Sequence, residues 1–231
     1  MSIEKFISDI GFEIKNYSLI EKALVHSSYS SEHKLGKLEN NERLEFLGDA
    51  VLKLSCSDYL YKKYPDKNEG QLSKIRSIMV SDAVLFEFAQ EIHLAEYLLL
   101  AQSEEKTGGR ERHSIIACAF EALLGALYIE TSYEKVSDFL VPFFEMKADY
   151  IENNFIKINP KAALQEYTQS LNKDLPKYIL VREFGKEHEK IFEVEVEYRG
   201  ETISIGQGAT KKEAEQNSAY NALIKLGVVN E

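Results

Sequence analysis

Several residue types that define common protein classes are scarce in this chain of 231 residues. Its two cysteines, Cys56 and Cys118, are too few for a disulfide framework or a four-cysteine zinc site. The most apolar stretch, residues 115–129, contains Glu121 and is shorter than the roughly 20 residues that cross a bilayer. The N-terminus lacks the basic start and apolar run of a signal peptide. We therefore expect a soluble protein of a reducing cytoplasm, with no membrane partner.

Positive charge is also in short supply, because 28 Lys and Arg face 38 Asp and Glu and give a formal net charge of −10. On average such a chain is repelled by polyanions such as nucleic acid and anionic membrane, which excludes indiscriminate binding to either. Signature motifs of several enzyme classes are missing as well. The sequence has no GxSxG, HExxH or GxxxxGK[ST] motif, and its five histidines are scattered without ligand spacing.

The hydrophobic content of 44% is enough to bury a core. Apolar residues recur every three or four positions over residues 44–60, 75–92 and 115–129, which predicts helices. We therefore expect the candidate functional residues of these segments to lie on helices. The N-terminal part, residues 1–152, is expected to be an all-α domain.

The pattern changes after a predicted linker over residues 153–158. Pro160 opens a short helix, strand-like segments follow at 177–183, 191–198 and 201–205, and a last helix begins after Thr210. This order, α-β-β-β-α, predicts a small α+β domain over residues 159–229.

Acidic residues interrupt two apolar helical segments. Glu42, Glu45 and Asp49 have the spacing i, i+3, i+7, which puts them on one face of a helix, and Glu121 lies in the second segment. A carboxylate in such surroundings is costly to bury unless it is paired.

Two interpretations of these acids remain open. Arg43 or Arg76 would neutralise one of them in a structural ion pair. Alternatively, the clustered carboxylates bind a hard divalent cation such as Mg²⁺, which would activate water and stabilise a phosphodiester transition state. With few cations to match several acids, we favour metal-dependent phosphoryl chemistry.

The segment Asn41-Glu42-Arg43-Leu44-Glu45-Phe46-Leu47-Gly48-Asp49 resembles the signature of the ribonuclease III family at every position. The stretches at residues 23–29, 69–76, 108–110, 114–116 and 120–126 are also similar to that family, in the same order. The C-terminal domain resembles its double-stranded-RNA-binding domain, so the resemblance covers nearly the whole chain.

The resemblance implies a Mg²⁺-dependent endoribonuclease that cleaves double-stranded RNA, with Mn²⁺ as a substitute ion. The products would carry 5′-phosphate and 3′-hydroxyl ends with short 3′ overhangs, and the cellular role would be processing of rRNA, mRNA and other structured precursors. Family members act as homodimers, and Phe46 matches an aromatic residue of the dimer interface; from the residues alone, an ordinary core Phe is an equally open interpretation. Glu45, Asp49 and Glu121 match metal ligands, with Asp49 and Glu121 catalytic, and Glu42 and Glu69 match further acidic residues of the cleavage site.

One position departs from the family pattern. Cys118 stands where the family usually has a metal-binding Asp, and a thiol is a soft ligand mismatched to Mg²⁺. Cys118 would then be a doubtful metal ligand or a small buried apolar residue. The rival hypothesis is a non-catalytic or weakly active double-stranded-RNA-binding protein of the same fold. We favour an active enzyme because the other acids are present.

The expected RNA contacts lie in the C-terminal domain. Thr210 and Glu213 have the spacing of a capping box, which would put Lys211 and Lys212 in the first turn, where helix ends favour phosphate. Three further residues match RNA-contacting positions of the family: Gln165, Glu166 and His188.

Overall fold

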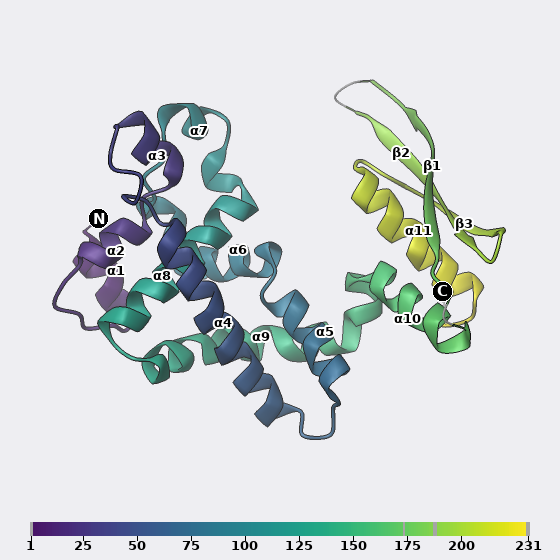
Figure 1. The fold of residues 1–231 in the computed structure, drawn as a ribbon, viewed down its shortest axis with the longest axis horizontal. Coiled ribbons are helices and arrows are strands. Elements are labelled where there is room, and N and C mark those ends of the chain that lie inside the picture. Colours follow the sequence, from purple (N-terminus) through teal and green to yellow (C-terminus); the bar gives the residue numbers. More distant parts are fainter. Residues whose placement is uncertain (1, 173, 187–188, 230–231) are drawn as a thin grey trace. The chain divides into compact units, whose positions relative to one another are not determined.

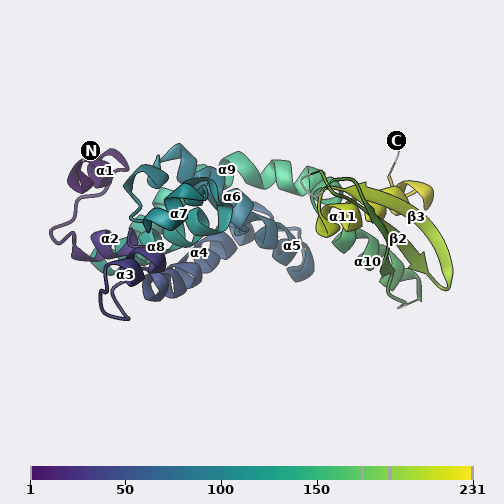
Figure 2. The same cartoon turned by 90° about the horizontal axis from the view of Figure 1, so that it is seen from above.

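The computed structural model describes residues 2–172, 174–186 and 189–229; His188 therefore lies outside the described residues. The chain divides into two compact units, Met1–Ile151 and Glu152–Glu231, which are treated separately below (Figures 1 and 2).

The N-terminal unit is helical, as expected. Helix α8 (His113–Glu130) runs through its core, and α4 (Glu42–Lys63) packs along it (Figure 1). The other helices that begin in this unit are α1 (Ile3–Asp9), α2 (Ser18–Ala23), α3 (Ser27–Glu32), α5 (Glu69–Met79), α6 (Asp82–Glu91), η1 (Leu94–Tyr97), α7 (Gln102–Lys106), η2 (Gly109–Glu111) and α9 (Tyr133–Ile158).

Helix α8 is the one helix in the described part of the chain that is long and apolar enough to cross a membrane. However, 61% of it is buried inside the protein, and its buried side chains include Phe120, Leu123 and Leu127. That burial is typical of a core helix.

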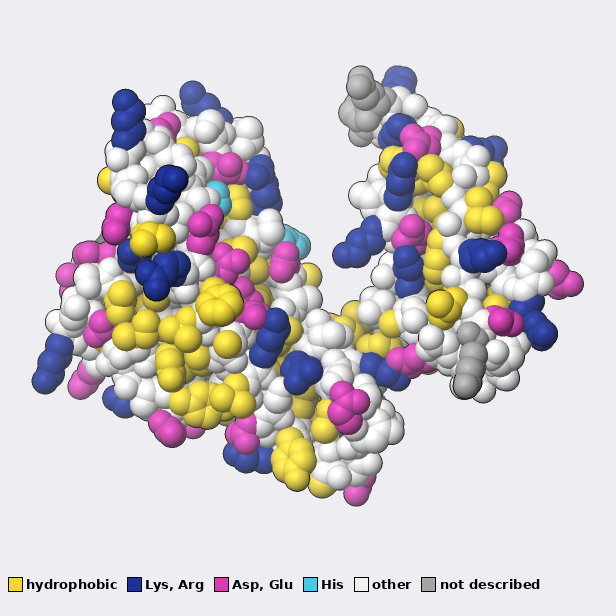
Figure 3. Space-filling model, in the orientation of Figure 1, with side chains coloured by type: hydrophobic (Ala, Val, Ile, Leu, Met, Phe, Trp, Pro, Cys, Tyr) yellow, Lys and Arg dark blue, Asp and Glu magenta, His cyan; other side chains and the backbone are white. Residues whose placement is uncertain are grey.

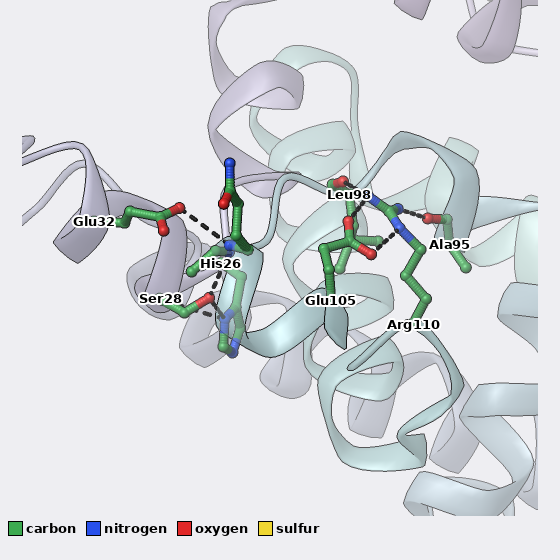
Figure 4. Close-up of polar contacts among 9 residues, drawn as sticks. His26, Ser28, Glu32, Ala95, Leu98, Glu105 and Arg110 are labelled. Atoms are coloured by element: carbon green, nitrogen blue, oxygen red, sulfur yellow. Dashed lines mark hydrogen bonds and ion pairs between the residues drawn. The ribbon is translucent and has the colours of Figure 1, made fainter. Parts of the chain in front are cut away.

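A polar network ties the segments around α3, η1 and α7 together (Figure 4). Ser28 Oγ accepts a hydrogen bond from the Ala101 backbone N–H at 3.1 Å and lies 2.8 Å from His26 Nδ1. Glu32 accepts one from the N–H of Gln102, the first residue of α7. Arg110 donates to the carbonyl groups of Ala95 and Leu98 and to the Glu105 carboxylate. These bonds hold the loops that precede α7 and α8 in one arrangement.

Helix α9 extends beyond the N-terminal unit. The segment 153–158, expected as a linker, is helical here, although Asn154 departs from helical dihedral angles (φ −118°, ψ 16°). Phe155 and Ile156 pack against the core of the C-terminal unit. The end of α9 therefore contributes to the second unit and does not act only as a connection.

The C-terminal unit has the expected α-β-β-β-α order. An antiparallel sheet, in the order β1-β2-β3, is covered on one face by two helices (Figures 1 and 2). Its elements are α10 (Pro160–Asn172), β1 (Lys177–Phe184), β2 (Ile191–Tyr198), β3 (Glu201–Gly208) and α11 (Lys211–Lys225).

The alternation in β2 sorts its side chains between the two faces of the sheet. Val194 and Val196 are buried, and Val196 packs with Leu164 and Leu223 in the core beneath the helices. The alternating glutamates point to the other face. Strands β1 and β3 both run past the expected ends, because they pair with the full length of β2.

Candidate active site

Helices α4 and α8 cross with their backbones in contact, and a glycine on each helix makes this possible. A Cβ atom on Gly48 would lie 1.7 Å from the Glu121 carbonyl oxygen, and one on Gly125 would lie 2.3 Å from the Leu44 carbonyl oxygen. No larger residue fits at either position unless the helices separate. The crossing therefore sets the distance between the acidic faces of α4 and α8.

Four half-buried side chains meet at this crossing: Glu45 and Asp49 from α4, and Cys118 and Glu121 from α8. Burial, followed by the negative charges of Asp49 and Glu45, raises the pKa of Glu121 to about 8. Apolar and acidic side chains lie next to one another on the face of the N-terminal unit that Figure 3 shows. The carboxylates thus repel one another in a partly desolvated place.

Cys118 belongs to the same cluster. Burial raises the pKa of its thiol to about 12, with further contributions from a hydrogen bond to Glu45 and from the charges of Glu45, Glu121 and Asp82. The thiol is therefore protonated at neutral pH and donates to the Glu45 carboxylate.

The cation at the site is Lys53, whose Nζ lies 2.7 Å from Asp49 Oδ2. Its charge also opposes the rise in the pKa of Glu121. The arginines considered from the sequence do not take this place. Arg76 donates to Ser57 Oγ at 2.8 Å, and Arg43 is exposed and forms no ion pair with any residue that the structure describes.

Among the described residues, no three His, Cys, Asp or Glu side chains are already gathered around one point as a metal site. The donor chemistry nevertheless fits a hard divalent cation, because Glu45, Asp49 and Glu121 offer carboxylate oxygens and are short of positive charge. A cation there would relieve the repulsion that burdens Glu121. The protonated thiol of Cys118 does not fit such an ion.

Two acids named from the sequence lie apart from the cluster. Glu42 is exposed at the first turn of α4, on the same face as Glu45. Glu69 is the first residue of α5, where its Oε1 accepts from Ser73 Oγ at 2.9 Å. It lines a groove of about 560 Å³ between α4 and α5, together with Tyr61.

An exposed apolar stripe follows α4. Its members lie at helical spacing and are Phe46 (81% exposed), Leu54 (57%) and Tyr61 (71%). Leu54 and Tyr61 also line the α4–α5 groove. Large apolar side chains exposed along one face of a helix are typical of an interaction surface.

The C-terminal unit presents its candidate RNA contacts on two helices. Gln165 is exposed and Glu166 is half-exposed on α10, and Lys211 and Lys212 are exposed in the first turn of α11. Lys211 Nζ lies 3.2 Å from Glu183 Oε1, whereas Lys212 has no ion-pair partner among the described residues.

Thr210 caps α11 by accepting from the Glu213 N–H at 3.1 Å. The Glu213 carboxylate reaches back one residue further than a capping box requires, to the Ala209 N–H. The start of the helix was therefore predicted correctly. The hydrogen bond of the Glu213 carboxylate goes to the N–H of Ala209, whereas the predicted capping box would have it go to the N–H of Thr210.

Lys53 is the residue that sequence reasoning missed. Its signal was present, since Asp49 and Lys53 have the i, i+4 spacing of a helical ion pair. Asp82 at the start of α6 was missed too, and its position near Cys118 follows only from how α6 packs on α8.

Known proteins match both parts of the chain. Residues 16–146 match the family model described as ribonuclease-III-like, and residues 160–226 match the double-stranded RNA binding motif. The chain is 44% identical to Ribonuclease 3 of Borreliella burgdorferi over 99% of its own length and 93% of that protein. It is 41% identical to Ribonuclease 3 of Listeria monocytogenes, covering 96% of this chain and 97% of that one.

A solved structure agrees with these sequence matches. The nuclease domain of ribonuclease III from Campylobacter jejuni superposes with a TM-score of 0.58 at 36% identity, covering 63% of this chain and 97% of that one. Sequence, domain order and fold point the same way, and the chain belongs to the ribonuclease III family.

Proposed function

We propose that this chain is an endoribonuclease that cleaves double-stranded RNA in a metal-dependent reaction. The observation that carries the proposal is the meeting of Glu45, Asp49 and Glu121 at the crossing of α4 and α8, in a chain that also has a double-stranded RNA binding motif. The relatives named Ribonuclease 3 support catalysis and disfavour the non-catalytic alternative. The products would be 5′-phosphate and 3′-hydroxyl ends with short 3′ overhangs.

Glu45, Asp49 and Glu121 would hold the cation, with Mg²⁺ as the natural ion and Mn²⁺ as a substitute. When bound, it would supply an activated water and stabilise the charge of the phosphodiester transition state. Lys53 would keep its contact with Asp49 and orient that carboxylate, because an ionised carboxylate can accept from an ammonium group and ligate a cation at the same time.

Glu42 and Glu69 would have supporting roles, which differ because their positions differ. Glu42 continues the acidic face of α4 and would help to orient water beside the three ligands. Glu69, in the α4–α5 groove, would act where a second subunit completes the site.

A homodimer would form through the apolar stripe of α4. Two antiparallel copies of that helix would bring Phe46 of one subunit to the α4–α5 groove of the other. This arrangement would cover the exposed apolar stripe and the groove at the same time. Support comes from the solved nuclease domain of Campylobacter jejuni ribonuclease III, which is described as flexible in a region involved in dimer formation.

The C-terminal unit would hold the duplex by shape. Lys211 and Lys212 would bind phosphates at the N-terminus of α11, and Gln165 and Glu166 would meet 2′-hydroxyl groups in a minor groove. Such domains span about 16 bp and largely ignore sequence. The substrates would be rRNA and mRNA precursors with long helical stems, processed in the cytoplasm.

A cleavage assay on long double-stranded RNA with Mg²⁺ or Mn²⁺ tests the proposal. Wild-type protein should cut, and Glu121→Ala should lose cutting while it still binds RNA in a gel-shift experiment. Changing both Lys211 and Lys212 to Glu should instead weaken binding. Binding without cutting by the wild-type protein under either ion would refute the enzyme, and full cutting by Glu121→Ala would refute the metal ligands.

A further inference from the structure

A second acidic feature lies away from the α4–α8 crossing. Two cavities of about 380 and 350 Å³ adjoin where the end of α1, the end of α6 with η1, and the start of α9 come together. They share Ile10 and Phe139 as a common wall. We call this feature the acidic groove, and five carboxylates line it: Asp9, Glu13, Glu91, Glu96 and Asp138.

Few basic side chains accompany these carboxylates in the described residues. In the described parts of the chain, no Lys or Arg lies within ion-pair distance of any of the five, and the nearest basic partner is His93, whose Nδ1 is 3.7 Å from Glu96 Oε1. Lys135 is the one Lys or Arg that lines the groove. Elsewhere in the same unit acids are paired, as Asp58 is with Lys62. The groove therefore has a local excess of negative charge.

Two helix ends add to that excess. Asp9 is the last residue of α1 and Glu91 is the last residue of α6, and neither helix has a basic residue in its last turn. Unpaired carbonyl groups give a helix C-terminus partial negative charge, so cations are favoured there and carboxylates are not. A local arrangement that stability alone disfavours is typical of a functional site.

Aromatic rings form the apolar part of the groove. Phe6 stacks on Tyr97 with ring centroids 4.4 Å apart, and Phe12 packs against Phe139 at 5.4 Å. Phe6 and Phe12 are buried, so the half-exposed rings of Tyr97 and Phe139 are the ones that face the groove. Rings next to carboxylates bind the aliphatic stem and the charged head of Lys or Arg side chains together. Each cavity is near the lower end of the range for ligand pockets, about 300–1,000 Å³, which suits single side chains.

We propose that the acidic groove docks a basic segment of a partner protein, in which Lys or Arg residues alternate with aliphatic residues. The cations face the five carboxylates and the two helix C-termini, and the aliphatic side chains cover the half-exposed rings of Tyr97 and Phe139. Charge complementarity decides between occupants, since a second copy of this acidic chain would bring more negative charge.

A fluorescein-labelled peptide of alternating lysine and leucine tests the proposal by anisotropy titration against the full chain with Mg²⁺ present. The double variant Asp9→Asn/Glu96→Gln should bind the peptide about tenfold more weakly, which corresponds to about 1.4 kcal/mol. The control Glu195→Gln/Glu201→Gln removes the same charge from a half-exposed and an exposed position in the C-terminal unit and should bind within about twofold of wild type. Both double variants should cleave double-stranded RNA like wild type, which separates this proposal from the proposed nuclease function.

Two further measurements locate the site and identify its ligand. Backbone amide signals of Gly11, Ile92 and His93 should shift when the peptide is added. A peptide of alternating glutamate and leucine should not bind. The proposal would be overturned if both double variants lost peptide affinity equally, or if the amide signals shifted only in α4 and α8. It would also be overturned if spermidine bound as tightly as the lysine peptide.

Discussion

At the scale of single residues, Cys118 changes the donor chemistry of the site. Its thiol is protonated and donates to Glu45, so it offers the cation neither a charge nor a hard oxygen. The site keeps three carboxylates, one of which is paired with Lys53. We therefore expect position 118 to influence how strongly the proposed cation is held.

Cys118→Asp should raise the affinity for Mg²⁺ by about tenfold, because a fourth carboxylate adds charge and a preferred ligand. Titration calorimetry with Mg²⁺ in the absence of RNA measures this directly, and the Mg²⁺ concentration for half-maximal cleavage should fall in parallel. Cys118→Ser, which keeps the size and adds no charge, should show no gain. If the serine and aspartate variants bind Mg²⁺ equally, position 118 plays no part in metal binding.

At the scale of secondary-structure elements, the α4–α8 crossing joins packing and chemistry. Gly48 lies against the backbone of the same residue, Glu121, whose carboxylate takes part in the site. The two helices cannot approach so closely with any side chain at position 48. Stability and activity are therefore expected to fail together here.

Gly48→Ala should destabilise the N-terminal unit by about 3 kcal/mol, at the upper end of ordinary overpacking, because the new methyl group would overlap a backbone carbonyl. Urea unfolding followed by circular dichroism measures the change. Gly70→Ala is the matched control: a Cβ atom there is 3.5 Å from Asn68 Oδ1, and Ala favours the helix, so stability should stay within about 1 kcal/mol. Equal effects of the two substitutions would contradict the close crossing.

The outer face of the sheet has its own charged network. Glu193 accepts from Arg182 Nε at 2.8 Å and Nη2 at 3.1 Å, and from Gln207. The hydrogen bond from Arg182, followed by that from Gln207, lowers the pKa of Glu193 below its ordinary value of 4.5. The folded protein thus favours the ionised form. The stabilisation is present above pH 4.5 and is lost as the pH falls through the lowered pKa.

Wild-type protein should therefore lose more stability in the C-terminal unit between pH 6 and pH 3 than Glu193→Gln, which has no charge to lose. Thermal unfolding followed by the methyl signals of Val194 and Val196 reports on this unit alone. Glu201→Gln, an equal change at an exposed position, should show the full wild-type loss. An identical loss in all three proteins would mean that the network does not stabilise the sheet.

Regular periodicity made most elements predictable. The strand Ile191–Tyr198 has the bounds that the sequence predicts, and the helix Pro160–Asn172 begins at the predicted residue, because both have a clear start and a regular apolar pattern. The same logic placed three acids on one face of α4. What the sequence could not show depends on contacts between elements, such as the position of Asp82 beside Cys118 and of Glu69 in the α4–α5 groove.

At the scale of the whole molecule, the exposed stripe of α4 bears on assembly. Phe46→Glu should shift the proposed dimer to monomer in analytical ultracentrifugation, with dimer affinity reduced at least about tenfold, because a large aromatic anchor is replaced by a charge. Leu171→Glu, at a similarly exposed apolar position on α10, should leave the dimer intact. A dimer that survives Phe46→Glu would place the subunit contact elsewhere.

The main-chain contact at Gly48 also bears on how the site can evolve. Since the spacing of the two acidic helices is set by backbone atoms, a ligand can be exchanged without loss of the scaffold that positions the others. Cys118 stands where the resemblance to the family leads us to expect a metal-binding Asp, and α4 and α8 remain in contact around the thiol. Natural variation at that position can therefore tune the choice of ion separately from the fold.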